Sequence, residues 1–168
     1  RILELIDDLR SKHYPIEVFD IGGGFAADYE TGRSPAAADY AAGIVPLLRD
    51  FTGGGGQVIL EPGRTIGGNA GVLLSRVQYV KRGGRKKFVI LDSGEHHLIR
   101  PTLYDAFHFI WPTKVAPMHE PKQRCREMGN PGLETCDVVG PICETGDYFA
   151  LDRPLPPVAR GDLLCVFT

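Results

Sequence analysis

The first 64 residues alternate helical and strand-like segments, and this alternation most constrains how the chain can fold. Apolar residues with helical spacing cover residues 1–12 and 34–51. A short apolar segment follows each of them, at residues 16–21 and 57–60. Helices that alternate with strands pack on parallel strands, so this part is predicted to be α/β with parallel strands.

The second predicted helix has recognisable start and interruption signals. Ser34 is a good N-cap, and Pro35 suits the first helical position. Pro46 lies inside the pattern, and we expect it to bend the helix or to separate its last turn.

The pattern changes near residue 70, where β-branched and strand-like segments replace the helices. Residues 72–80 and 87–91 flank a glycine turn and predict an antiparallel hairpin. Residues 136–142 and 162–167 predict further strands, with proline-rich loops such as 154–157 between them. We therefore predict two domains, residues 1–70 and residues 71–168.

Composition excludes several classes of protein. Hydrophobic residues make up 43% of the chain and charged residues 24%, which is unlike a disordered chain. No segment approaches about 18 uninterrupted apolar residues, so no membrane span is expected. The net charge of −2 offers no electrostatic case for nucleic acid. The 4 cysteines have no scaffold-like pairing, which favours a reduced, cytoplasmic setting.

Two glycine-bearing turns at strand ends are candidate ligand sites. Gly22-Gly23-Gly24 presents backbone N–H groups that a phosphate can approach closely. Glu61-Pro62-Gly63-Arg64 ends the next strand, and parallel strands gather their ligands at such ends. The alternatives are a tight turn for the first motif and a surface ion pair for the second.

Two later motifs carry side chains suited to an amino-acid ligand. Arg100 with Tyr104 could hold a carboxylate, although a salt bridge at a loop is the alternative. Cys143 could exchange a proton, and Glu144 could hold an ammonium group. A small buried hydrophobic residue is the alternative for Cys143.

The histidines do not predict a metal site. Four histidines and two cysteines fall in the second half, namely His96, His97, His108, His119, Cys125 and Cys136. Their spacing matches no zinc motif, so we expect no metal.

Taken in order, four motifs resemble the family of pyridoxal-phosphate decarboxylases that act on ornithine, diaminopimelate and arginine, with the alanine-racemase-like fold. The motifs are Asp20–Phe25, Glu61–Arg64, Leu98–Ala106 and Val139–Asp147. The resemblance covers essentially the whole chain. It implies an α/β fold in which the end of a pyridoxal-phosphate-binding (β/α)8 barrel precedes a C-terminal β-barrel or sandwich domain.

The resemblance also implies roles for these residues. Gly22, Gly23, Gly24, Gly63 and Arg64 would cradle the cofactor phosphate, and Glu61 would face the pyridine nitrogen. A carboxylate there favours the protonated ring, which is the better electron sink.

For the substrate, Arg64, Arg100 and Tyr104 would grip the distal carboxylate of an amino acid. Cys143 would return a proton to the carbanion and Glu144 would pair with the distal ammonium. In the family these last two act in the site of a partner subunit, which implies a homodimer.

The implied reaction is decarboxylation of meso-2,6-diaminopimelate to L-lysine and CO2. A related decarboxylase for ornithine, lysine or arginine and a non-catalytic regulatory homologue are the alternatives. Glu95-His96-His97 departs from the family's Met-Asn-Asp-like run, which puts fine substrate preference in question. The family's Schiff-base lysine has no counterpart here, so we expect this piece to be inactive by itself.

Overall fold

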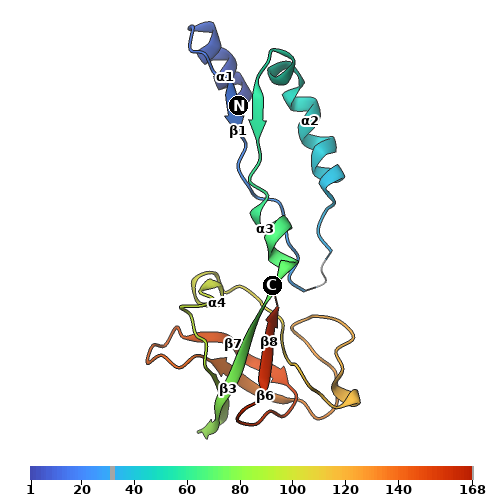
Figure 1. Ribbon diagram of the computed structural model, residues 1–168, viewed down its shortest axis with the longest axis vertical. Coiled ribbons are helices and arrows are strands. Elements are labelled where there is room, and N and C mark those ends of the chain that lie inside the picture. Colours follow the sequence, from blue (N-terminus) through green and yellow to red (C-terminus); the bar gives the residue numbers. More distant parts are fainter. Residues whose placement is uncertain (31–32, 168) are drawn as a thin grey trace. The chain divides into compact units, whose positions relative to one another are not determined.

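The computed structural model describes residues 1–30 and 33–167, and they form two compact units (Figure 1). The helix–strand unit comprises Arg1–Ala27 and Arg33–Gly67, and the sheet unit comprises Asp28–Gly32 and Gly68–Thr168. The domains expected from the sequence, 1–70 and 71–168, stay a prediction. Among the described residues, no helix has the length and apolar character needed to cross a bilayer.

The helix–strand unit confirms the predicted parallel strands. Its elements are α1 (Ile2–Ser11), β1 (Val18–Asp20), α2 (Ala37–Gly53), β2 (Gln57–Ile59) and α3 (Gly63–Gly67). β1 pairs with β2 in parallel, with Phe19 opposite Val58. Phe51 of α2 is buried, and its ring lies 6.0 Å from that of Phe19 in an edge-on arrangement. Aromatic packing of this kind holds the helix on the strand pair.

The described residues of the helix–strand unit do not form the end of a (β/α)8 barrel. β1 and β2 form a two-stranded sheet of three-residue strands, and two strands cannot close on themselves. The expected end of a (β/α)8 barrel therefore requires correction, because this chain shows a parallel strand pair covered by helices.

The second helix also differs from its predicted form. It begins at Ala37 with Ala36 as the N-cap, so Ser34 is not the cap. The side chain of Asp39 accepts a hydrogen bond from the N–H of Ala36 at 2.8 Å and satisfies the helix start. The helix continues through Pro46 to Gly53, so its last turn is not separated. Leu48 and Phe51 are buried beyond the proline, and their packing outweighs one missing hydrogen bond.

The sheet unit confirms the expected C-terminal β domain. Its helical elements are η1 (Gly68–Ala70), α4 (Arg100–Tyr104) and η2 (Pro117–His119). Its strands are β3 (Val72–Gly83), β4 (Lys86–Leu91), β5 (Ile110–Pro112), β6 (Glu134–Val139), β7 (Tyr148–Leu155) and β8 (Leu163–Phe167). They form one mixed sheet in the order β5-β8-β3-β4-β6-β7. β3 and β4 form the predicted antiparallel hairpin, while β4 and β6 are parallel.

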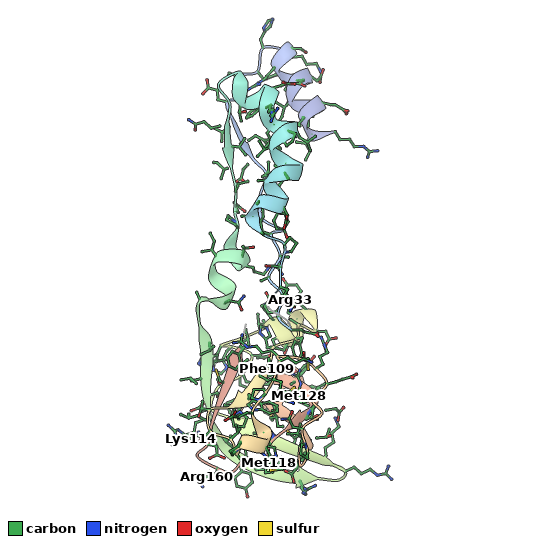
Figure 2. The ribbon with its side chains drawn as sticks, turned by 90° about the vertical axis from the view of Figure 1, so that its right-hand side faces the viewer. Arg33, Phe109, Lys114, Met118, Met128 and Arg160 are labelled. Carbon is green, nitrogen blue, oxygen red and sulfur yellow. The ribbon has the colours of Figure 1, made fainter. Side chains whose placement is uncertain are left out.

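Both edge strands contribute to a single core. Ile110 of β5 and Phe149 of β7 are almost fully buried and belong to the same hydrophobic cluster. The sheet must therefore curve around this cluster. Figure 2 labels Phe109, which is a member of the cluster, and Met128, which packs against it.

Candidate functional site

The two glycine turns predicted as ligand sites lie next to each other in the helix–strand unit. Pairing of β1 with β2 brings their ends together, and the N–H of Glu61 donates to the carbonyl of Gly22 at 2.9 Å. A Cβ atom on Gly23 would lie 2.8 Å from the carbonyl oxygen of Glu61. No other residue type would allow the turns to approach this closely.

The first turn has the shape and the donors that a phosphate group requires. Gly22 and Gly24 have φ values of +72° and +89°, which favour glycine. Within the described ranges, the N–H groups of Gly23 and Gly24 donate to no protein acceptor. A turn without side chains that carries free backbone donors fits a phosphate. The residues present therefore fit the phosphate end of pyridoxal phosphate.

Glu61 and Arg64 lie exposed at the second turn. The N–H of Gly63 bonds back to the carbonyl of Glu61 at 2.8 Å, which tightens the turn at the start of α3. In the described part of the chain, neither side chain has a hydrogen-bond or ion-pair partner. Both charges are therefore available to a ligand, and the surface ion pair considered for this motif is not formed.

In the sheet unit, Arg100 is held by aromatic side chains. Its guanidinium carbon lies 4.9 Å from the ring centre of Tyr29 and 5.9 Å from that of Tyr104. Nη1 of Arg100 also donates to the hydroxyl of Tyr29 at 3.4 Å. Such contacts orient a guanidinium without neutralising it, so its charge can still meet a carboxylate.

Tyr29 is a site residue that the sequence does not reveal. It comes from a short segment before α2, 71 positions from Arg100, and no motif surrounds it. Its ring packs edge-on against the ring of His108, 5.4 Å away. His108 is buried, and burial lowers the pKa of its imidazole, so it is neutral near pH 7. Nδ1 of His108 donates to the carbonyl of Phe167 at 2.9 Å, which fixes the ring that supports Tyr29.

Cys143 and Glu144 lie on the exposed loop between β6 and β7. Cys143 is exposed and forms no disulfide, so the alternative that it is a small buried hydrophobic residue does not hold. Oε1 of Glu144 accepts a bond from the N–H of Gly146 at 3.3 Å within the same loop. Both side chains are thus open to solvent and to a ligand.

The loop of Cys143 and the segment leading into α4 are tied together. Asp147, at the end of the loop, is 3% exposed and accepts N–H bonds from Glu95 and Ile142. The hydroxyl of Thr102 on α4 donates to the carbonyl of Gly146. The sequence analysis assigned no role to Asp147. The only sequence feature that could have drawn attention to it is its place at the end of the motif Val139–Asp147, next to Gly146.

The paired histidines take no part in a metal cluster. The rings of His96 and His97 lie 3.9 Å apart, and Nδ1 of His97 accepts the N–H of Gly94 at 3.4 Å. Among the residues described, no group of three or more potential ligands could hold a metal ion.

Known proteins are similar to this chain over nearly its whole length. The family model described as "Pyridoxal-dependent decarboxylase, C-terminal sheet domain" matches residues 7–168. The chain is 40% identical over 169 residues to diaminopimelate decarboxylase of Aquifex aeolicus, and 42% identical over 168 residues to that of Pseudomonas aeruginosa. These alignments cover 100% and 99% of the chain but 36% of each relative.

A solved structure is similar over the same region. It is diaminopimelate decarboxylase of Helicobacter pylori complexed with L-lysine, with a TM-score of 0.77 and 32% identity. The match covers 99% of this chain and 37% of that one. The chain therefore spans little more than a third of the length of the proteins it resembles.

Proposed function

The chain belongs to the pyridoxal-dependent decarboxylase family, and from this premise we propose that it forms part of an enzyme that decarboxylates meso-2,6-diaminopimelate to L-lysine. The observation that carries this proposal is the meeting of the two glycine turns. Among the described residues, the N–H groups of Gly23 and Gly24 have no protein acceptor, and the adjacent turn bears Glu61 and Arg64, whose side chains have no partner. This is the set of groups that pyridoxal phosphate requires at its phosphate and ring nitrogen.

In this proposal, the glycine turns hold the cofactor. Gly22, Gly23, Gly24 and Gly63, with Arg64, would surround the phosphate, and Glu61 would keep a proton on the pyridine nitrogen. The cofactor supplies an electron sink for the pair of electrons left when CO2 departs.

The sheet unit would contribute substrate binding and proton transfer. Arg100 and Tyr104 would bind the distal carboxylate of the substrate, because a guanidinium pairs with both of its oxygens. Arg64 of the helix–strand unit would have the same role. Glu144 would bind the distal ammonium group. Cys143 would deliver a proton from its thiol to the carbon that lost CO2.

Assembly and location are further parts of the proposal. Cys143 and Glu144 would act in the site of a second copy, so the working protein would be a homodimer. A reduced cytoplasmic setting stays a prediction from the cysteines, all 4 of which are free in the structure.

The test is an assay of the full-length protein with pyridoxal phosphate. CO2 release should be fastest from meso-diaminopimelate, compared with ornithine, lysine and arginine. Glu61→Gln should lower turnover strongly and leave the fold intact, whereas Glu17→Gln, another exposed carboxylate of the same unit, should not. Faster release from another substrate would favour a related decarboxylase. No release from any of them would favour a non-catalytic homologue.

A further inference from the structure

Asp147 connects two segments that carry proposed substrate-binding and proton-transfer residues. Its carboxylate is buried, and each oxygen accepts one backbone N–H. Oδ1 accepts from Glu95, on the segment that leads into α4, at 2.7 Å. Oδ2 accepts from Ile142, the residue before Cys143, also at 2.7 Å. One side chain thus holds both segments at a fixed separation.

Two glycines make room for this carboxylate. A Cβ atom on Gly94 would lie 2.5 Å from Oδ1 of Asp147, and one on Gly140 would lie 2.3 Å from its oxygens. Real Cβ atoms do not approach this closely, so a side chain at either position would displace the carboxylate. The two glycines therefore leave the carboxylate of Asp147 just enough room for the position it occupies.

Cys143 is positioned through its neighbours in the loop. In the described part of the chain, the thiol of Cys143 has no hydrogen-bond partner. Both neighbours of Cys143 are anchored by Asp147: the carboxylate of Asp147 accepts the N–H of Ile142, and the N–H of Asp147 donates to the carbonyl of Glu144 at 3.1 Å. Glu144 and Thr102 also bond to Gly146, which lies beyond Cys143 toward the end of the loop.

We propose that Asp147 is a positioning residue that fixes the place of the Cys143 thiol through the backbone of Ile142. This inference rests on the proposed function, in which Cys143 is the proton donor. Proton transfer depends steeply on donor placement, and a shift of about 1 Å can cost on the order of 100-fold in rate. A displaced loop should therefore slow turnover even where the fold is intact.

The experiment is a double-mutant cycle on kcat in the full-length protein with pyridoxal phosphate. The variants are Asp147→Asn, Cys143→Ala and the combination of both. Asparagine keeps the shape of aspartate but turns an N–H donor toward one of the two backbone N–H groups. We expect Asp147→Asn to lower kcat at least tenfold when Cys143 is present and less than twofold when Cys143→Ala is already in place.

Matched controls separate positioning from folding. Asp162→Asn changes a carboxylate that accepts one backbone N–H from Ala159 at 2.8 Å in the same unit, and should leave kcat unchanged. If Asp147→Asn does not fold, Gly94→Ala should show the same dependence on Cys143, because its methyl group would displace the carboxylate. Gly129→Ala, where a Cβ meets nothing within 4 Å, is its control.

Each outcome decides between the two proposals. An equal loss of kcat in both backgrounds, or no loss from Asp147→Asn, would overturn the positioning role and leave the proposed function standing. If Cys143→Ala alone left kcat unchanged, the proton-donor role of Cys143 would fall, and the positioning role with it.

Discussion

The guanidinium of Arg100 lies 4.9 Å from the centre of the Tyr29 ring and donates to the hydroxyl of the same residue at 3.4 Å. Tyr29 precedes α2, whereas Arg100 begins α4, so the two residues meet although α2, β2 and α3 lie between them in the chain. An aromatic support of this kind holds the orientation of an arginine while leaving its charge free for a ligand.

Replacing Tyr29 should weaken substrate binding more than turnover. Tyr29→Phe keeps the ring and loses one hydrogen bond, which contributes about 0.5–1.5 kcal/mol. Tyr29→Leu also removes the aromatic face, so KM for meso-diaminopimelate should rise further while kcat changes little. Steady-state kinetics measure both parameters. Tyr79→Leu, at an exposed tyrosine of β3, is the control. An unchanged KM in Tyr29→Leu would show that the contact does not orient Arg100 for binding.

Removing the guanidinium itself should have a larger effect. Arg100→Ala is expected to raise the activation free energy measured by kcat/KM by about 2–5 kcal/mol, because the substrate carboxylate would be left without its partner. Arg160→Ala, at an exposed arginine of the same unit, should have no effect. Unaltered kinetics in Arg100→Ala would exclude this residue from substrate binding.

Two leucines of β7 offer a matched test of the core. Leu155 is 1% exposed and Leu151 is 51% exposed. Leu155→Ala should lower the free energy of unfolding by about 2–5 kcal/mol, since it removes buried apolar contacts and leaves a cavity. Leu151→Ala should change it by less than about 0.5 kcal/mol. Urea unfolding measures both, and equal effects would contradict the placement of β7 against the core.

Asp92 should make the sheet unit sensitive to acid. The N–H of Arg76 and the hydroxyl of Ser75 donate to its carboxylate at 2.8 and 2.7 Å, and these bonds lower the pKa of Asp92. Its contribution to stability is therefore complete above the unfolded pKa, roughly 3.9, and is lost as pH falls through the folded value.

Asp92→Asn should consequently reduce the loss of unfolding free energy as the pH falls below about 4. The measurement is urea unfolding at several pH values, with Asp162→Asn as the comparison. An unaltered acid dependence in Asp92→Asn would show that this carboxylate is not one of the groups responsible.

The cysteines should differ sharply in reactivity. Burial raises the pKa of Cys136 to about 11, whereas Cys143 is exposed. Thiolates are the reactive form, so a thiol reagent at pH 8 should modify Cys143 and spare Cys136 until the protein is unfolded. Peptide mapping by mass spectrometry identifies the modified sites. Early modification of Cys136 would contradict its burial.

The β3–β4 hairpin was predictable because its strands are neighbours in sequence, and the parallel pair of β1 and β2 was predictable because helical and strand-like segments alternate. Strand β7 escaped prediction, since its Pro154 resembled part of a proline-rich loop. The strand lies at the edge of the sheet, where a residue without an N–H is tolerated. β5, which contains Pro112, lies at the other edge and was missed as well.

The residues of the candidate site that lie in recognisable sequence motifs could be predicted. The two glycine turns could be paired from sequence because parallel strands place their carboxyl ends together. Tyr29 could not be found, since only the folded chain brings it to Arg100. The role of Asp147 likewise depends on the backbone N–H of Glu95, 52 positions away. Long-range contacts of this kind leave no local pattern.

A crystal structure of the full-length protein with pyridoxal phosphate tests most directly whether the two glycine turns hold the cofactor. We expect phosphate oxygens within hydrogen-bond distance of the N–H groups of Gly23 and Gly24, with the carboxylate of Glu61 facing the pyridine nitrogen. A phosphate bound away from these turns, or a Glu61 carboxylate directed away from the ring, would contradict this expectation.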